Sequence, residues 1–424
     1  MIAKIDRDKI KFIIFFFIIL LSFYRSPFIF LNGRFFAEEG SVFFVHANEV
    51  SLFKNIFFIE LSAGYLNLIA NILVGISAKF PIVYSPFVSV YLSFLFVLLP
   101  PYLILFRNSE LFKNNFNKFI GALIFFISTP LVPEIWLNTI NLQVYLCLSS
   151  ILIIFMYKLK FYQKIFNSII LILGGFSGVY TCALLPLFFL KFLKKRNIYN
   201  LFNSLILFST SLIQIFLIIN SKLNSYLTPT VLRLDTSYES ISLFIYNIII
   251  RPITGRETAI FFFDLIYKFF DPVILFLITF SLLIVYLFIY RISFFNFLKK
   301  NDKFLILLTI FILINLIIIV GSVGSYYGGR YSAIPGVTLL LIIFNLINNT
   351  FRKKKFLLST VLVIALINGI NEFRPQDNKS SYGLKLLDCI NCPIWKSEIE
   401  KWREDKNYNI GLWPYPSKKM KLNR

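Results

Sequence analysis

Two adjacent carboxylates, Glu38 and Glu39, are the residues whose types and spacing in this sequence most directly suggest chemistry. They lie in the stretch "RFFAEEGSVFF", just after an apolar N-terminal segment. One carboxylate can be the general base that deprotonates a hydroxyl group, while the other orients that hydroxyl or binds a divalent cation such as Mg²⁺ or Mn²⁺. The alternative is that the pair is an acidic, solvated loop that marks the end of a helix.

Several nearby polar residues are candidates for the same site, and each has a simpler alternative. Arg34 either lines a substrate pocket or pairs with Glu38. His46 is either a metal ligand beside the two glutamates or a surface or packing histidine. Glu134 either contacts an acceptor or caps the following helix. The other candidates for the pocket in these loops are Tyr65 and Trp136.

The composition predicts that these residues belong to a membrane protein. The chain has 424 residues, is 58% hydrophobic and has a mean hydropathy of +0.75. Apolar runs of the roughly 17–25 residues needed to cross a bilayer recur along it. The fold class expected is therefore an all-α polytopic membrane protein with about 11 transmembrane helices, within a range of about 10–12. The expected helices are 12–31, 82–106, 119–133, 142–157, 166–176, 179–190, 200–220, 273–290, 304–321, 336–350 and 356–370.

The distribution of charge predicts which side of the membrane each loop faces. Basic residues gather between the expected helices in six clusters, at 4–11, 107–118, 158–164, 191–196, 291–303 and 352–355. These clusters hold 22 of the 43 Lys and Arg residues and only four of the 21 Asp and Glu residues. Because Lys and Arg collect in cytoplasmic loops, we expect a cytoplasmic N-terminus and an outer C-terminus. The net charge of +22 then reflects topology, and no nucleic-acid partner is expected.

One segment can keep both of its basic ends on the same side of the membrane only if the chain turns back within it. Both ends of the stretch between Lys164 and Lys191 are basic, and "GGFSGVYT" at 174–181 lies in its middle. Glycine is costly inside a helix, so this motif predicts a break. Residues 166–190 form either two short helices or a re-entrant hairpin.

The same topology divides the chain into a transmembrane domain, 1–370, and an outer C-terminal tail, 371–424. The large first outer loop, 32–81, carries the acidic pair. Within it, 54–80 is expected to be an interfacial helix, because a spanning helix would place the cluster at 107–118 on the wrong side. In the tail, Cys389 and Cys392 have the spacing of a local disulfide, which an outer location favours. Trp395 and Trp402 either dock the tail on the loops or form a platform for sugars.

Three short motifs resemble the GT-C superfamily of integral-membrane glycosyltransferases, in an uncharacterised bacterial branch. They are "RFFAEEGSVFF", "GYLNLIANILVGISAKFP" at 64–81 and "GGRYSAIP" at 328–335. The closing stretch "WKSEIEKWREDKNYNIGLWPYP" is similar to the tail of bacterial membrane proteins that share the first loop. Such enzymes transfer a sugar from a polyprenyl-phosphate carrier on the outer face of the membrane. The superfamily pattern often contains an Asp where this chain has two glutamates.

The resemblance implies roles for specific residues. Glu38 or Glu39 would be the catalytic base. Arg330 would bind the phosphate of the donor, since a guanidinium can donate two parallel hydrogen bonds to phosphate oxygens; otherwise it anchors a helix end. Tyr327 and Tyr331 would line the same pocket or belong to the interfacial aromatic belt.

The expected function is transfer of a sugar from a polyprenyl-phosphate-linked donor to a surface glycan or lipid-linked acceptor. The expected location is the bacterial cytoplasmic membrane, with the active site facing outward and membrane lipids as neighbours. Two alternatives remain, a lipid-linked oligosaccharide flippase or transporter and a glycan polymerase. Transporters place charges within central helices, whereas most charges here lie at the ends of the expected helices, which favours the enzyme.

Overall fold

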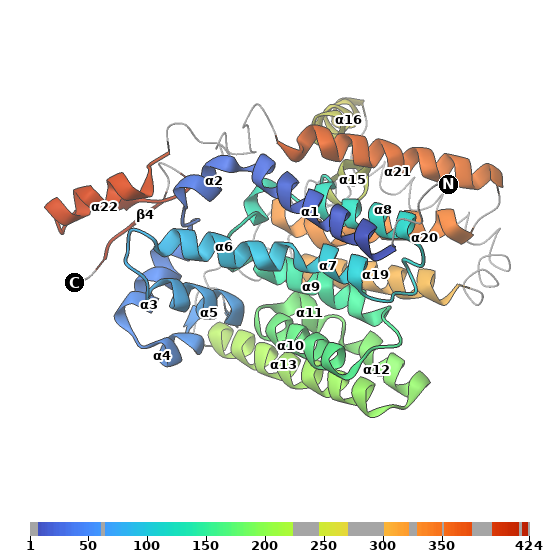
Figure 1. Cartoon of the computed structure of the whole chain (residues 1–424), viewed down its shortest axis with the longest axis horizontal. Coiled ribbons are helices and arrows are strands. Elements are labelled where there is room, and N and C mark those ends of the chain that lie inside the picture. Colours follow the sequence, from blue (N-terminus) through green and yellow to red (C-terminus); the bar gives the residue numbers. More distant parts are fainter. Residues whose placement is uncertain are drawn as a thin grey trace. The chain divides into compact units, whose positions relative to one another are not determined.

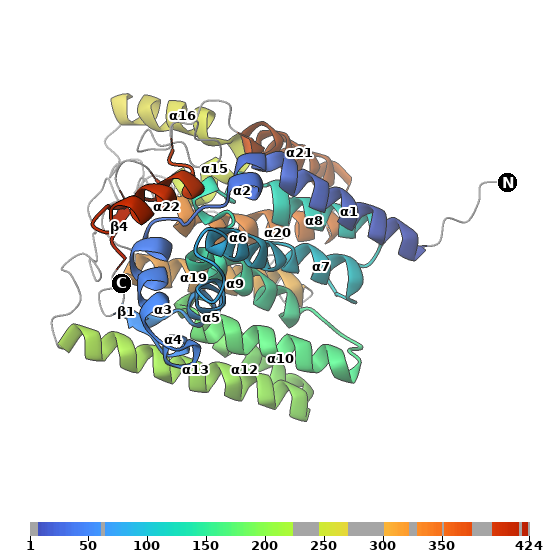
Figure 2. The same ribbon diagram turned by 60° about the vertical axis from the view of Figure 1, so that its left-hand side comes forward.

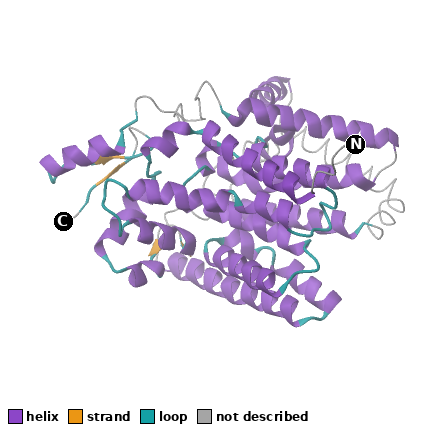
Figure 3. Cartoon of the chain, viewed as in Figure 1, coloured by secondary structure: helices purple, strands orange, loops and turns teal. Residues whose placement is uncertain are grey.

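A computed structural model describes residues 7–60, 64–223, 246–269, 301–321, 329–349, 352–374, 392–414 and 418–422. The structure in these ranges is almost entirely helical, with only short strands (Figure 3). The chain forms two compact units. Unit 1 comprises Met1–Ala122, Pro133–Thr228 and Arg374–Arg424, and unit 2 comprises Leu123–Val132 and Pro229–Phe373.

Unit 1 contains the acidic pair, the broken segment and the tail (Figure 1). Its first half holds α1 (Arg7–Arg25), α2 (Pro27–Asn32), η1 (Glu39–Phe44), α3 (Val45–Glu49), α4 (Leu52–Ile56), β1 (Ile59–Glu60), β2 (Tyr65–Leu66), α5 (Leu68–Ser77), α6 (Ser85–Val97) and α7 (Leu99–Phe106). Its second half holds η2 (Pro133–Ile135), η3 (Thr139–Asn141), α9 (Leu142–Ile154), α10 (Phe161–Phe176), α11 (Val179–Cys182), α12 (Leu185–Lys195), α13 (Ile198–Leu223), α22 (Trp395–Glu404), β3 (Ile410–Gly411) and β4 (Lys419–Met420). Helix α8 (Asn115–Ile127) begins in unit 1 and ends in unit 2.

Unit 2 is built around three long helices. Its described elements are η4 (Tyr246–Ile250), α15 (Arg251–Thr254), α16 (Arg256–Phe269), α19 (Asp302–Gly321), η5 (Gly329–Ser332), α20 (Ala333–Asn349) and α21 (Arg352–Phe373). Helix α20 packs against both α19 and α21. The amide of Asn368 in α21 donates to the carbonyl of Ile253 at 3.0 Å and so fixes α15 beside it.

Several long apolar helices indicate a multi-pass membrane protein. Within the described residues, four are long and apolar enough to cross a bilayer: Ser85–Phe106, Ile198–Ser221, Arg330–Asn349 and Lys354–Phe373. A fifth span results if Phe161–Phe176 and Val179–Lys195 count as one, although they are bent by 119°. The outward face of α13 carries large apolar side chains such as Phe208 and Phe216, which are 50% and 66% exposed.

The expected number of about 11 spans was therefore wrong for the described residues, where four or five meet the requirement. The expected segments 119–133 and 142–157 correspond to the short helices Asn115–Ile127 and Thr139–Ile154. A helix of 13 residues rises only about 20 Å, less than the roughly 30 Å of a hydrocarbon core. The expected helix 273–290 lies outside the described residues.

The first helix also ends earlier than the expected span 12–31. Helix α1 stops at Arg25, and Pro27 begins the separate helix α2. Proline has no backbone N–H and disfavours helical backbone in the residue before it, so a helix breaks there. The hydroxyl of Ser26, in the break, accepts a hydrogen bond from the indole of Trp136 at 2.7 Å.

Basic residues gather at one end of unit 1, as the charge pattern predicted. Nζ of Lys118 donates to the carbonyls of Leu105 and Arg107 at 2.7 and 3.1 Å, at the end of α7. Nζ of Lys191 donates to the carbonyls of Ile153 and Ile154 at 3.2 and 2.6 Å, at the end of α9. The last carbonyls of a helix have no partner within it, so lysine side chains stabilise these two helix ends.

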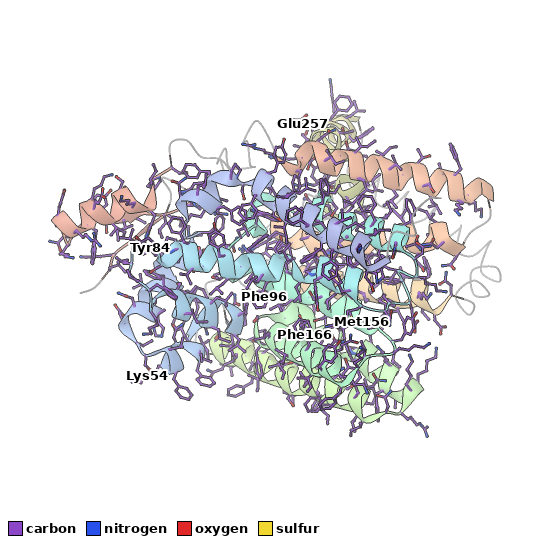
Figure 4. All side chains as sticks on the ribbon, in the orientation of Figure 1. Lys54, Tyr84, Phe96, Met156, Phe166 and Glu257 are labelled. Carbon is purple, nitrogen blue, oxygen red and sulfur yellow. The ribbon has the colours of Figure 1, made fainter. Side chains whose placement is uncertain are left out.

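The acidic pair lies at the opposite end of unit 1. Helix α1 runs about 28 Å from the basic end to Arg25, and α2 then leads into the loop that carries Glu38 and Glu39. Figures 1 and 2 show α3 and α22 together, far from the start of α1. Tyr84 directly precedes α6, and Met156 follows the end of α9. In Figure 4, Tyr84 lies on the left and Met156 lies well to the right of it.

The segment 54–80 differs from the single interfacial helix expected. It contains the end of α4, the hairpin of β1 and β2, and the buried helix α5. The amide of Asn71 donates to the carbonyls of Ile56 and Phe58 at 3.0 and 2.7 Å, and Asn55 donates to the carbonyl of Asn71 at 2.6 Å. These asparagines satisfy backbone groups inside the unit, which an amphipathic surface helix does not require.

The predicted break at 174–181 is confirmed. Helix α10 ends at Phe176, and Gly178 has a φ of +156° before α11 begins. Polar groups from other elements occupy the break: the hydroxyl of Ser177 accepts from the amide of Ile69 at 2.9 Å, and the side chain of Gln214 donates to the carbonyl of Gly175 at 3.1 Å. The broken backbone is thus buried within protein, as is required at membrane depth.

Replacing Gly178 with alanine should destabilise this break. Its φ disfavours a side chain, and an added Cβ would overlap the side chain of Gln143. We expect Gly178→Ala to lower the free energy of unfolding by about 1–3 kcal/mol, measured by thermal unfolding of the detergent-solubilised protein. Gln143→Ala in the same background should recover part of the loss. Equal stability of Gly178→Ala and the parent chain would contradict this account.

Candidate active site around the acidic pair

The loop that carries the acidic pair is held in place by the C-terminal tail. Gly33, with a φ of +64°, ends α2, and the chain then runs alongside Trp413 as an isolated parallel bridge at Phe36. The amide of Trp413 donates to the carbonyl of Phe35 at 3.3 Å, and the amide of Ala37 donates to the carbonyl of Trp413 at 2.5 Å. Ala37 has the left-handed φ of +48° and turns the chain into Glu38 and η1.

Glu39 is buried and fully hydrogen-bonded. Only 1% of the residue is exposed. Its Oε1 accepts from the amide and the hydroxyl of Thr139 at 2.9 and 2.7 Å, and its Oε2 accepts from the amide of Phe36 at 2.9 Å. Burial raises the pKa of this carboxyl, while the three hydrogen bonds and the charge of Arg34 act in the opposite direction. Glu39 therefore ties the loop to the segment before α9 and offers no free oxygen to a substrate.

Arg34 lies in the same buried cluster. Its Nη2 donates to the carbonyl of Trp136 at 2.9 Å, and its guanidinium carbon lies 4.9 and 5.0 Å from the ring centroids of Phe36 and Trp413. Burial lowers the pKa of Arg34 to about 10, so it remains a cation at neutral pH. Among the described residues, Nε and Nη1 of Arg34 have no hydrogen-bond acceptor, and the two aromatic faces provide the stabilisation instead.

Glu38 differs from its neighbour because it is half-exposed. Its Oε1 accepts a hydrogen bond from Nζ of Lys418 at 2.8 Å, and 46% and 41% of the two side chains are exposed. The expected alternative that Arg34 pairs with Glu38 was wrong, because Arg34 turns towards the carbonyl of Trp136. Of the two glutamates, Glu38 is the one whose carboxylate a substrate can reach.

Tryptophan side chains dock the tail against unit 1. Nε1 of Trp395 donates to the carbonyl of Ile82 at 2.8 Å, and its ring meets that of Phe35 edge-on at 5.2 Å. The ring of Trp413 stacks on that of Phe28 at 5.8 Å. The docking interpretation is thus confirmed for Trp395, which is 3% exposed.

Glu398 stabilises the fold of the tail itself. Its Oε1 accepts from Lys401 at 2.9 Å, and its Oε2 accepts from the amide of Gly411 at 2.7 Å and the hydroxyl of Tyr408 at 3.0 Å. Burial acts to raise the pKa of Glu398, but these hydrogen bonds outweigh it and lower the pKa below its usual value. The ionised carboxylate therefore joins α22 to β3.

The remaining candidates in unit 1 do not surround Glu38. His46 stacks on Phe58 with ring centroids 3.9 Å apart, and burial lowers its pKa. The hydroxyl of Tyr65 accepts from Gln143 at 3.3 Å, beside the helix break. Glu134 does not cap the next helix: Asn138 caps η3 by accepting from the amide of Asn141 at 3.1 Å.

Trp136 is 1% exposed and serves packing. Besides its hydrogen bond to Ser26, its ring lies 4.4 Å below the guanidinium of Arg25, and its carbonyl accepts from Arg34. Trp136 therefore holds Arg34 of the acidic loop in place and is not accessible to a substrate.

Arg330 and Tyr331 lie in unit 2, at η5. Nη2 of Arg330 donates to the hydroxyl of Tyr331 at 3.2 Å, and the guanidinium carbon lies 5.1 Å from the centre of that ring. Tyr327 lies outside the described residues. The assignment of Arg330 to the donor phosphate stays a prediction.

The remaining candidates are cysteines and potential metal ligands. Cys392 is disulfide-bonded, whereas Cys147 and Cys182 are free thiols. Cys389 lies outside the described residues, so its pairing stays a prediction. In the described ranges, no three His, Cys, Asp or Glu side chains gather to hold a metal ion.

Sequence reasoning missed the partners of the acidic pair, namely Thr139, Lys418 and Trp413. Thr139 follows "EIWLN" in the next loop that the sequence assigned to the outer face, and its only signal was that location. The tail sequence "LWPYPSKKM" combines a tryptophan with lysines, which fit an aromatic and cationic contact with an acidic loop.

Substituting each glutamate in turn should show that Glu39 contributes more to the free energy of unfolding than Glu38 does. In Glu39→Gln an amide N–H₂ replaces one accepting oxygen, so one buried N–H donor loses its partner. We expect this variant to lose about 1–3 kcal/mol of unfolding free energy. Glu38→Gln should change it by less than about 1 kcal/mol, because a half-exposed ion pair contributes little. Thermal unfolding of both variants in the same detergent measures this, and equal losses would refute the division.

Acidification should loosen the tail as Glu398 becomes protonated. Because its folded pKa is lowered from 4.5, its stabilisation is fully present above about pH 4.5 and is lost as the pH falls through the folded pKa. Hydrogen exchange across 392–422, corrected for intrinsic rates, should reveal that loss. Glu398→Gln should expose the tail already at pH 7, whereas Glu400→Gln on the same helix should behave like the parent. A tail equally protected at pH 7 and pH 3 would contradict this role.

No family model, curated protein or solved structure matches this chain. The function is therefore argued from the residues themselves. In unit 1 these place the half-exposed Glu38 on a loop whose other charged groups, Glu39 and Arg34, are buried and hold it in position, and they bring Lys418 of the tail to it.

Proposed function

We propose that the chain is an integral-membrane glycosyltransferase that takes a sugar from a polyprenyl-phosphate carrier. The observation that carries this proposal is the difference between the two glutamates. Glu38 is half-exposed and hydrogen-bonded to Lys418 through one oxygen, whereas Glu39 is buried with both oxygens occupied. A general base needs a reachable carboxylate held in a fixed place, and this arrangement meets both needs.

In the proposed reaction, Glu38 accepts the proton of an acceptor hydroxyl. The hydroxyl oxygen then attacks the anomeric carbon of the sugar, and a carbon–oxygen bond forms. The bond between that carbon and the phosphate oxygen breaks, and its electron pair leaves with the polyprenyl phosphate. A direct displacement of this kind inverts the anomeric configuration.

Glu39 and Arg34 act as positioning residues in this scheme. Neither has a free group directed at a substrate, but both fix the backbone on either side of Ala37. Because small displacements of a catalytic group reduce rate steeply, a rigid loop is an advantage. Lys418 donates a hydrogen bond to one oxygen of Glu38 at 2.8 Å and so helps to hold this carboxylate in place.

We place the protein in the bacterial cytoplasmic membrane, with the acidic loop on the outer face. The basic clusters at 107–118, 158–164 and 191–196 lie at the end of unit 1 away from the acidic loop, which supports this orientation, since Lys and Arg favour the cytoplasmic side. The long apolar helices suit a donor whose polyprenyl chain enters from the lipid, and the acceptor is a surface glycan or a lipid-linked glycan.

The test is the mass profile of surface glycans from the source cell. It compares the intact gene, a deletion, and the deletion complemented with Glu38→Gln or Glu60→Gln at matched membrane abundance. Glu60, a half-buried glutamate of β1, serves as the control. We expect the deletion and Glu38→Gln to lose the same sugar-sized mass increment, while Glu60→Gln retains it.

The alternatives give different profiles. A defect in the deletion with a normal profile for Glu38→Gln would reject the catalytic role and favour a lipid-linked oligosaccharide transporter. A changed distribution of chain lengths, without loss of a single increment, would favour a glycan polymerase.

A further inference from the structure

The tail contains a polar groove that lies apart from the acidic pair. It has a volume of about 500 Å³, within the roughly 300–1,000 Å³ of small-ligand pockets. Its polar walls come from the end of α22, the turn that follows it and the β3–β4 hairpin. The polar side chains that line it are Glu398, Lys401, Asn407, Tyr408, Asn409 and Lys419.

One wall of the groove is rigid because Glu398 holds it. That carboxylate accepts three hydrogen bonds from within the tail, from Lys401, Tyr408 and the amide of Gly411. A Cβ added to Gly411 would lie 2.9 Å from Cγ of Pro393 and 3.0 Å from Oε2 of Glu398, so the backbone is packed tightly here. The shape of the groove therefore does not depend on a ligand.

Other lining residues of the groove offer side chains that are free to bind. Within the described ranges, the side-chain amides of Asn407 and Asn409 and the ammonium of Lys419 make no hydrogen bond or ion pair with the protein, and all three residues are exposed. Each asparagine amide presents both a donor and an acceptor, as the neighbouring hydroxyls of a sugar ring do. Lys419 adds a positive charge, whereas the charge of Lys401 is balanced by its ion pair with Glu398.

The hairpin joins this groove to the candidate active site. Successive side chains of a strand point to opposite faces. Lys418 is directed at Glu38, and its neighbour Lys419 lines the groove. One strand thus separates the two places, a span that a short oligosaccharide can cross.

We propose that this groove binds an anionic saccharide, of the uronic-acid type, as part of a longer glycan. The polar amides recognise the hydroxyls, and Lys419 recognises the carboxylate. A membrane surface fits the groove less well, because none of its lining residues is a large exposed apolar side chain. The further step, that this glycan is the acceptor for Glu38, rests on the proposed function.

Binding can be measured without any transfer reaction. The probe is tetragalacturonate, titrated by isothermal calorimetry into the full-length protein in nanodiscs of neutral phosphatidylcholine. Maltotetraose is the uncharged comparison. We expect tetragalacturonate to bind at least about tenfold more tightly than maltotetraose, and affinity to fall about tenfold or more in Lys419→Gln and in the double variant Asn407→Ala, Asn409→Ala.

Two control variants define the site. Lys421→Gln removes the same charge two residues further along the chain, just after β4 and outside the lining of the groove, and its affinity should equal that of the parent. Glu38→Gln should also bind normally, so a failure of the transferase proposal is distinguishable from a failure of this one. Hydrogen-exchange protection at Gly411 shows that each variant keeps a folded tail.

Three results of the calorimetry would overturn the proposal. They are no binding of tetragalacturonate, equal binding of maltotetraose, and equal loss of affinity in Lys419→Gln and Lys421→Gln. If Lys419→Gln instead weakens only the attachment to phosphatidylglycerol vesicles, the groove contacts lipid headgroups and the saccharide assignment is wrong.

Discussion

A buried carboxylate with two occupied oxygens is the constraint on which this end of unit 1 depends. A charge removed from water is costly unless it is hydrogen-bonded. Glu39 meets that requirement with donors from its own loop and from Thr139, 100 residues further along the chain. The requirement fixes the loop before η1 against the segment that precedes α9. Arg34 and Trp136 continue the same contact from the other side, so the conformation of the loop follows from the need to satisfy one side chain.

The tail extends this constraint to the other end of the chain. Trp413 pairs with the backbone at Phe36, covers the guanidinium of Arg34 and stacks on Phe28. The guanidinium of Arg34 therefore lies against two aromatic rings, those of Phe36 and Trp413. These rings stabilise its charge, although, among the described residues, Nε and Nη1 have no hydrogen-bond acceptor. Because these contacts place β4 beside the loop, Lys418 reaches Glu38 and Lys419 faces away. The tail is thus part of the candidate site, although it lies 380 residues from Glu38 in sequence at the ion pair.

Periodicity and charge predicted much of the architecture but little of the site. The apolar runs located the spans Ser85–Phe106 and Ile198–Ser221, and the glycines at 174–181 predicted the break. The two spans and the break depend on local sequence patterns. Within the described residues, the number of spans was overestimated because an apolar run shows burial without showing whether lipid or protein covers it. Helix α9 is buried by its neighbours, and its sequence alone resembles that of a lipid-facing helix. The partners of the glutamates depend on contacts between distant segments, which periodicity does not reveal.

Adjacency itself explains why the two glutamates differ. Glu38 is the residue before η1 and Glu39 is its first residue, and adjacent residues at a helix start do not face each other, so the two meet different surroundings. Glu39 turns into the interior and is bound there, while Glu38 turns towards the tail and the solvent. A single glutamate could not both anchor the loop and remain available, since anchoring uses both of its oxygens. Two neighbouring carboxylates resolve that conflict within one turn of backbone, because the buried one sets the position of the half-exposed one.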